Sequence, residues 1–548
     1  MFEDIDLDAI QEENARELVK RLLNMIEQLS AEGRELRIEN QRLRDEVNRM
    51  KGEQGKPNIG GDQGGRGGSA NHSSETERHQ KRKRQKKSKK NAMPIQREAV
   101  LKVDRARLPA DAKSKGYATV VVQDVRIQAE NVRFYKEKYY SASQHKTYLA
   151  ELPPGYTGQF GPGIRSLALT LYYGVGTSEP KIQEFLENLG VKISKGAVSN
   201  MLIQAQDGFH AESAAVYEAG LGSSPWQQTD HTETRVDGQN QHCQVVCNPL
   251  YTSYHTRVGK DRLTVLDVLR QGRKRIFRLN QEALAILENV ALSKAAQKLL
   301  PKWRSEIVWE EMDFVTRLDR ALPNLNIQQR TAILGAAAVA AYHAEPGVPI
   351  VDTLVSDDAS VFHWLTRALM LCWVHDGRAY KKLEPVVAWH REQLKDFRKR
   401  YWVYYHRLAA YRQNPDAEKR LQLESEFDEL FTTHTEYYDL DQRIEKTRAK
   451  KDSLLQVLEH PELPLHNNAS ELAVRQRVRK RDVSFSPRTP LGVKAWDTFA
   501  TLADTTRKLG ISFYAYIQDR ISESHQIPPL ATLVTQRAHE LNLGASWV

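Results

Sequence analysis

The stretch Leu463–Arg481, LPLHNNASELAVRQRVRKR, contains the features from which the fold can be inferred. Its HNNAS run, residues 466–470, offers good residues for the start of a helix, and the apolar residues that follow give the helix one apolar side. The helix carries one acid, Glu471, and Arg475 lies four residues later on the same face. A carboxylate among so many cations suggests a site where a metal ion and a phosphate meet. For this stretch alone, an exposed helix with ordinary ion pairs is the alternative.

Two further acids occur upstream, each within or at the end of an apolar, strand-like run. Three antiparallel strands followed by a helix are predicted at about 226–236, 241–248 and 252–258. The first strand carries Asp230, and the DGQN tetrapeptide after it is typical of a hairpin turn. Further along, the apolar strand 350–356 ends on Asp357, and a shorter strand candidate ends on His375. We therefore expect Asp230, Asp357 and Glu471 to meet in one site.

The order of these elements predicts a multidomain α/β protein with a ribonuclease-H-like, mixed-sheet catalytic core. Phosphoryl transfer on DNA needs two divalent metals about 4 Å apart. Carboxylates from different elements suit the hard Mg²⁺ ion, or Mn²⁺ in its place. The core is expected at 222–270, 346–376 and 463–520, helical insertions at 271–345 and 377–462, and a C-terminal tail at 521–548.

Length and charge limit the class of protein. The 548 residues have room for several domains, and the net charge of +10 favours a polyanionic partner, of which nucleic acid is the commonest. Three cysteines give no disulfide framework, and Cys243 and Cys247 alone are too few for a zinc site of the usual kind. No apolar run approaches the length of a membrane span, and the acidic start MFEDIDLDAI does not resemble a signal peptide. We expect a cytoplasmic, nucleoid-associated protein.

The N-terminal region 10–51 is predicted to form one long helix with a heptad repeat. One seam position recurs at Leu22, Leu29, Leu36, Leu43 and Met50. The companion position holds Val19, Ile26, Asn40 and Val47, with Gly33 as the weak member. Branched residues at one position, leucines at the other and a single Asn favour a parallel two-stranded coiled coil, and hence a homodimer. The alternative is one amphipathic helix that packs on its own chain.

The next region, 52–98, is rich in Gly and Ser and then in Lys and Arg. This composition predicts a disordered basic linker that can hold a phosphate backbone, with a merely solvated linker as the alternative. Alternating, β-rich runs within 117–149 predict a small antiparallel β unit over 99–152.

A helix-turn-helix DNA-binding domain is predicted over 153–215. The segment 178–190 has the start and end signals of one short helix, and Ser194 can start a second. An ordinary pair of antiparallel helices has the same marks. If the motif binds DNA, the second helix presents to it Lys195, Ser199 and Asn200.

Four short motifs carry a resemblance to a known family. They are DHTETRV at 230–236, LVSD at 354–357, CWVH at 372–375 and NNASE, with Arg475, at 467–475. They are similar to the D-E-T-x-x-R-V strand, the second aspartate, the C-W-x-H segment and the N-N-A-x-E-x-x-x-R helix of the DDE transposases of the insertion-sequence "sixty-six" group. Residues 161–200 also resemble that family's helix-turn-helix, and the order of parts agrees over most of residues 15–520.

The resemblance implies that Asp230, Asp357 and Glu471 are the catalytic residues and coordinate the metals, with Asp358 as a neighbouring alternative to Asp357. It also implies that two more side chains lie near the scissile phosphate, namely His375 and Arg475. The other reading of the histidine is a satisfied side chain at a strand end.

Basic residues beside the three acids are expected to contact DNA. On the Glu471 helix these are Arg477, Lys480 and Arg481. In the second insertion they are Arg378, Lys381 and Lys382. The neighbouring Trp373 is expected in the core.

Three departures from the family pattern are visible. The family usually carries a four-cysteine zinc module before the helix-turn-helix, whereas this chain has no cysteine before Cys243. The asparagine pair usually follows Asp and here follows His466. The stretch between Asp230 and Asp357 is also longer than expected, which implies the helical insertion. These departures leave the three acids in place.

The implied function is that of a DNA transposase, which cleaves the ends of an insertion sequence and transfers the freed strand with Mg²⁺ or Mn²⁺. The implied partners are double-stranded DNA (terminal inverted repeats and target DNA), a second copy of the chain, and accessory proteins of the same element. The alternatives are a non-catalytic DNA-binding regulator, such as a domesticated transposase, and a ribonuclease-H-like nuclease that does not join strands.

Overall fold

A mixed, five-stranded sheet lies at the centre of the computed structural model, which describes residues 10–50, 94–104, 107–109, 111–288 and 290–547. The sheet order is β5-β4-β3-β8-β9, in which β5, β4 and β3 are antiparallel neighbours and β3, β8 and β9 are parallel. The mixed α/β class is therefore confirmed. The strands are β3 (Trp226–Val236), β4 (Gln239–Cys247), β5 (Thr252–Arg257), β8 (Thr353–Ser356) and β9 (Ala368–Leu371).

The first three strands follow the predicted ranges to within two residues. The turn between β3 and β4 is Asp237-Gly238, shorter than the predicted tetrapeptide, and both residues have positive φ, 48° and 78°. Two consecutive positive φ values are what a two-residue hairpin of the primed type requires, and Asp-Gly adopts them readily. The turn fixes the register of the whole β3–β4 pair.

Strand β5 is the outermost strand of the sheet, and its free edge is covered by α19 (Pro490–Lys508). Alternate backbone N–H groups of β5 donate to side chains spaced one turn apart on that helix. These pairs are Thr256 with Asp497 Oδ2 (2.7 Å), Tyr254 with Thr501 Oγ1 (3.1 Å) and Thr252 with Thr505 Oγ1 (3.4 Å). Because the edge donors are satisfied in this way, β5 offers little to a further strand.

Helix α18 (Asn468–Ser484), which carries Glu471, packs on β3 and β4. Its Ala473 is buried with Cys243, Val245 and Tyr254 in a small apolar cluster. The other helices of the core are α6 (Asp207–Gly222), α7 (Arg262–Leu269), α20 (Phe513–Ile521) and α21 (Leu530–Leu541). The predicted C-terminal tail contains α21, which packs on α6 through the buried Leu530 and Val534.

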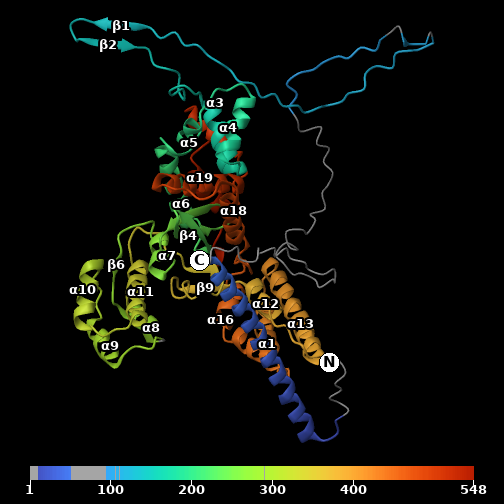
Figure 1. Ribbon diagram of the computed structural model, residues 1–548, viewed down its shortest axis with the longest axis vertical. Helices are drawn as coiled ribbons and strands as arrows, with labels where there is room; N and C mark the ends of the chain where they lie inside the picture. Colours follow the sequence, from blue (N-terminus) through green and yellow to red (C-terminus); the bar gives the residue numbers. More distant parts are fainter. Residues whose placement is uncertain (1–9, 51–93, 105–106, 110, 289, 548) are drawn as a thin grey trace.

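Two helical insertions interrupt the core and lie at the same end of the molecule (Figure 1). The first contains β6 (Ile276–Phe277), α8 (Gln281–Glu288), α9 (Lys294–Leu299), η4 (Leu300–Trp303), β7 (Trp309–Glu310), α10 (Glu311–Ala321) and α11 (Ile327–His343). The second contains α12 (Trp373–Lys381), α13 (Ala388–Gln413), α14 (Ala417–Phe431), α15 (Tyr438–Arg448), α16 (Lys451–Leu454) and α17 (Gln456–Glu459). A short 3₁₀ turn, η5 (Ala545–Trp547), ends the described chain.

The region predicted to bind DNA lies at the opposite end of the molecule (Figure 1). It contains α3 (Pro162–Leu169), η3 (Thr170–Val175), α4 (Glu179–Asn188) and α5 (Lys195–Ile203). Ser194 caps α5, since its side chain accepts a hydrogen bond from the Ala197 N–H. The two short helices therefore begin where the sequence predicts.

The β unit predicted over 99–152 is much smaller than expected. Its strands are β1 (Lys138–Ser141) and β2 (Lys146–Leu149), and the described residues from 111 to 137 have no assigned strand. The alternating apolar side chains of this stretch are exposed, for example Val120 and Val122. Alternation stabilises a strand when one face is buried, and here no described element covers that face.

Helix α1 (Glu13–Met50) confirms the predicted long helix and packs on its own chain near its start. Leu23 is buried against Val387, and the Glu27 carboxylate accepts the N–H groups of Val386 and Val387 at 2.9 and 2.8 Å. At the companion seam position Val19 and Ile26 pack against the same cluster, whereas the residues of the first seam position are exposed, namely Leu22, Leu29, Leu36, Leu43 and Met50. The helix therefore packs on its own chain around Leu23 and Glu27, as the alternative interpretation expects, and dimerisation through the rest of the helix stays a prediction.

Two remaining expectations concern the linker and membranes. The basic linker falls mostly on residues 51–93, which lie outside the described residues. Within the described part of the chain, no helix combines the length and apolarity needed to cross a bilayer.

Candidate active site

Two neighbouring parallel strands bring Asp230 and Asp357 to adjacent positions. In the register of β3 and β8, Gln228 lies beside Val355, and each acid follows two residues further toward the carboxyl end. Neighbouring strands are about 4.8 Å apart, and residues two apart share one face of the sheet. The two carboxylates therefore lie side by side where β8 ends.

The third acid reaches the same place because α18 begins against β3. The N–H of Ala469 donates to Gln228 Oε1 at 3.2 Å, and the Ser470 hydroxyl lies 3.3 Å from the carbonyl oxygen of Thr229. Glu471 follows directly in the first turn of the helix, with its side chain 16% exposed. The structure thus brings together all three acids that the sequence singles out.

Burial and the neighbouring acids both raise the pKa of Asp230. Burial, followed by the negative charges of Asp357 and Glu471, raises its pKa to about 7. A hydrogen bond from the His231 N–H, at 2.7 Å, acts in the opposite direction because it favours the carboxylate. A cluster of this kind favours the binding of a cation.

Asp358, the alternative to Asp357, is engaged elsewhere. Its carboxylate lies 3.3 Å from His363 Nε2 and 2.5 Å from Lys450 Nζ. The hydrogen bond from His363, together with Lys450, lowers its pKa to about 2. Asp357 is the acid whose charge acts on Asp230, so the geometry favours Asp357 over its neighbour.

The CWVH segment forms the wall beside Glu471, and it differs from the predicted strand end. β9 ends at Leu371, and His375 lies in the first turn of α12. The Trp373 N–H donates to the Leu465 carbonyl oxygen at 3.0 Å, which ties this turn to the segment before α18. Trp373 is fully buried, which confirms its predicted place in the core.

An arginine that sequence reasoning assigned to DNA binding lies at this wall. Arg378 Nη2 is 3.8 Å from Glu471 Oε2, and its Nη1 is 3.2 Å from His375 Nε2. His375 Nε2 is itself 3.6 Å from Glu471 Oε1. The spacing of one helical turn between the histidine and the arginine is the signal in the sequence that could have indicated this pair.

The described residues contain one group of three or more potential metal ligands whose ligand atoms all lie within 4.8 Å of one another. This group is Cys372, His375 and Glu471. Asp230 and Asp357 stand outside it, although the charge of Glu471 acts on Asp230. Glu471 is therefore the carboxylate shared by two sets of possible ligands.

Two basic residues of α18 do not present their charges to solvent, which corrects the expectation that they contact DNA. Arg477 is 4% exposed, pairs with Asp497 at 3.1 Å and lies over the Trp496 ring. Lys480 Nζ donates to the carbonyl oxygen of Thr177 at 3.0 Å, and burial lowers the pKa of Lys480 to about 7. Both side chains join α18 to its neighbours.

The other predicted DNA contacts remain accessible to different degrees. Arg481 is half-buried and donates to the Glu233 carbonyl oxygen, and Arg475 is exposed. Lys195, Asn200, Lys381 and Lys382 are exposed, and Ser199 is half-buried.

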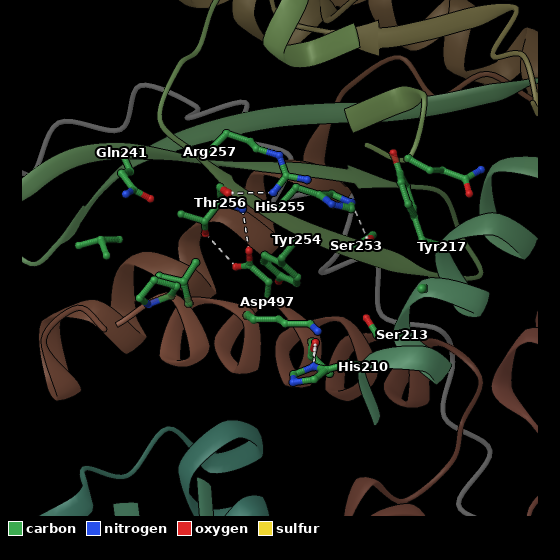
Figure 2. Close-up of a pocket in the computed structure, with 17 residues that line it drawn as sticks. His210, Ser213, Tyr217, Gln241, Ser253, Tyr254, His255, Thr256, Arg257 and Asp497 are labelled. Carbon is green, nitrogen blue, oxygen red and sulfur yellow. Dashed lines mark hydrogen bonds between the residues drawn. The ribbon is translucent and has the colours of Figure 1, made fainter. Parts of the chain in front are cut away.

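A cavity of 630 Å³ lies apart from the acids, between β5, α6 and α19 (Figure 2). His255 projects toward Tyr217, with the ring centroids 4.4 Å apart, and Asp497 accepts from Thr256. Asp230, Asp357 and Glu471 do not line this cavity. We assign it no role.

The sheet order and the acid cluster define a mixed α/β protein with a carboxylate-rich site where β8 ends beside the middle of its parallel neighbour β3. The sequence profile described as "Transposase IS66 family" matches residues 338–495, which include Asp357, Cys372, His375 and Glu471. The chain belongs to this family. It therefore has a transposase-type function, with DNA as its partner.

A curated relative extends the likeness beyond the profile. The uncharacterized protein y4jO of Sinorhizobium fredii is 30% identical over 321 residues, which are 58% of this chain and 99% of that protein.

Proposed function

We propose that the protein is a DDE DNA transposase that cleaves the ends of its insertion sequence and transfers the freed strand to target DNA. The observation that carries this proposal is the meeting of Asp230, Asp357 and Glu471, which are widely separated in sequence. The strand order and the acid-bearing helix α18 support a ribonuclease-H-like core. The enzymatic step goes beyond what family membership alone establishes.

The residues of this site fit a pair of Mg²⁺ or Mn²⁺ ions. All three donors are carboxylates, which are the ligands that hard divalent cations prefer. Glu471 Oε1 is buried and has no hydrogen-bond partner among the described residues, so a cation would satisfy it. When bound, two such ions would activate the attacking oxygen and stabilise the leaving oxygen.

The protein's own groups would position the acids and contact the reacting phosphate. The anchoring of α18 to Gln228 and Thr229 fixes Glu471 relative to Asp230. Arg378, whose side chain is 43% exposed, has its guanidinium beside the cluster and can meet a phosphate oxygen. His375 also lies beside the cluster, with its Nε2 3.6 Å from Glu471 Oε1, and is proposed near the scissile phosphate. Arg475, exposed on α18, is the second arginine proposed near the scissile phosphate.

DNA recognition is proposed for the helix-turn-helix at the far end. Lys195, Ser199 and Asn200 on α5 would contact the terminal repeats, and Arg481 would add a contact near the core. The exposed seam of α1 supports a homodimer that joins two ends. Accessory proteins of the same element are further proposed partners.

The test is incubation of the purified full chain with Mg²⁺ and labelled DNA ends taken from the flanks of its gene. The proposal predicts nicks at the element's ends and joined products, both lost in Glu471→Gln. Nicks without joined product would favour a nuclease. A protein that binds the ends and leaves them intact would be a regulator, and the proposal would fail.

A further inference from the structure

Glu471 belongs to a second set of possible ligands that differs in chemistry from the three acids. Cys372 Sγ, an imidazole nitrogen of His375 and a carboxylate oxygen of Glu471 all lie within 4.8 Å of one another. A thiolate, an imidazole and one carboxylate are a donor set that suits Zn²⁺ far better than Mg²⁺.

We propose that Cys372, His375 and Glu471 form a Zn²⁺ site that inhibits the enzyme by withdrawing Glu471 from the Asp230–Asp357 pair. The inhibitory part of this inference rests on the proposed function, whereas the binding part does not. A Zn²⁺ ion bound to Glu471 would turn this carboxylate toward Cys372 and His375 and place a second dication beside the Asp230–Asp357 pair, so a metal in one set weakens the other.

The spacing of the set is close to what a zinc ion needs. Zinc bonds of about 2.0–2.3 Å put the ligand atoms of a tetrahedral site about 3.3–3.8 Å apart. His375 Nε2 and Glu471 Oε1 are already 3.6 Å apart. A contraction of about 1 Å at most, on the scale set by those bonds, would bring the thiol into range.

Orphaned polar atoms point to a missing partner at this place. His375 Nδ1 and Glu471 Oε1 are both buried and have no hydrogen-bond partner among the described residues. Both amide atoms of Asn467, which precedes the helix, are in the same condition. Buried polar atoms are rarely left unpaired, and several at one spot are expected where a ligand completes the structure.

Backbone N–H groups also surround the thiol. Those of Asn467 and His375 lie within hydrogen-bonding reach of Cys372 Sγ. Such contacts orient a metal ligand and stabilise the charge on it. Arg378 Nη1 lies 3.2 Å from His375 Nε2 and its Nη2 lies 3.8 Å from Glu471 Oε2, so a metal bound by these two residues would displace this guanidinium, whose side chain is 43% exposed.

The binding test uses Co²⁺ as a spectroscopic stand-in for Zn²⁺ on the chelator-treated, full-length protein. A thiolate–Co²⁺ charge-transfer band is expected at one equivalent and should disappear when Zn²⁺ is added. Cys372→Ser should abolish the band, whereas Cys243→Ser, a change at an equally buried thiol outside the set, should keep it. His375→Gln, at a partly exposed position, removes a ligand and should weaken Co²⁺ binding by more than the roughly 10–100-fold that loss of a supporting contact costs.

Asp230→Asn separates this site from the proposed catalytic one. Asp230 is outside the set, so this variant should keep the band while it loses Mg²⁺-dependent nicking. In an active protein, the ratio of nicking without Zn²⁺ to nicking with Zn²⁺ should exceed about 10 in the wild type and approach 1 in Cys372→Ser.

The outcomes distinguish the two proposals. A band without any nicking would leave the metal site standing and remove the transposase mechanism. Nicking without a band, or a band that survives Cys372→Ser, would overturn the metal site. Equal inhibition by Zn²⁺ in wild type and Cys372→Ser would overturn its inhibitory role.

Discussion

The backbone N–H of Ala469 donates to Gln228 Oε1 at 3.2 Å, and this bond joins the start of the Glu471 helix to the Asp230 strand across 241 residues of sequence. Gln228 is 5% exposed, so water does not compete freely for the bond. The position of Glu471 relative to Asp230 therefore depends on the uncharged side chain of Gln228.

Replacement of Gln228 by Ala should slow DNA nicking by about 10–100-fold, because a displacement of about 1 Å costs this much when reacting groups must be aligned. The measurement is the single-turnover nicking rate with saturating Mg²⁺. Gln227→Ala is the matched control, since Gln227 is buried on the same strand and bonds to the other side of the sheet. Equal losses in both variants would indicate general destabilisation.

Asp357 and Asp358 are adjacent acids with different surroundings, and they offer a second test. Asp357→Asn should reduce nicking more than about 100-fold, beyond the effect of changing a supporting residue. Asp358→Asn removes an acid that pairs with His363 and Lys450 and should reduce nicking only a few-fold, by roughly the size of a weak surface contact. If the two losses were reversed, the ligand assignment would be wrong.

The two arginines Arg475 and Arg477 lie on one helix and should behave differently. Arg477→Ala leaves Asp497 buried without its partner and should destabilise the protein by about 3–5 kcal/mol. Arg475→Ala, at an exposed position, should change stability by less than about 0.5 kcal/mol while it slows nicking. Thermal unfolding of both variants, followed by nicking assays, measures each effect. A stable Arg477→Ala protein would contradict the structural role.

His255 should make the protein sensitive to acid. Burial, and then the charge of Arg257, lowers its pKa from 6.5 to about 3. Between these pH values the unfolded chain binds a proton that the folded protein excludes, so stability is lost as pH falls from 6.5 toward 3. His255→Gln should flatten the dependence of the unfolding midpoint on pH over this window. His525→Gln, at an exposed position, should keep the wild-type slope, and identical slopes in all three proteins would refute the assignment.

The exposed seam of α1 should hold two copies together. Leu36→Lys with Leu43→Lys should convert a dimer to a monomer in light-scattering measurements, because charge at two seam positions opposes packing. Gln28→Lys with Gln41→Lys adds the same charge at exposed positions away from the seam and should leave the dimer intact. A wild-type protein that is monomeric at high concentration would exclude this interface.

The sequence was sufficient for the centre of the fold because its signals are local. Alternation of apolar residues and the Asp237-Gly238 turn determine the β3–β4 pair, and start signals such as Ser194 determine the short helices. The three acids were found from the motifs that surround them. Asp230 and Asp357 converge because β3 and β8 pair in parallel, and Glu471 joins them because α18 begins against β3.

What the sequence did not predict depends on contacts between distant residues. The burial of Arg477 requires Asp497 and Trp496, and the docking of α1 requires Val387, about 360 residues from Glu27. The pairing of Arg378 with Glu471 also joins two separate motifs. The overestimated β unit shows the reverse case, since an alternating pattern with no element to cover it forms only the β1–β2 hairpin.

The most direct test of the central claim is iron-mediated cleavage of the protein itself. Fe²⁺ is exchanged into the Mg²⁺ site and oxidised by peroxide, which yields hydroxyl radicals, while ascorbate reduces the iron back to Fe²⁺; the radicals cut the chain beside the bound metal. The account predicts cuts near Asp230, Asp357 and Glu471 in one sample, all suppressed by excess Mg²⁺. Absence of cuts near Asp230 and Asp357, or cuts that persist in excess Mg²⁺, would contradict a shared metal site.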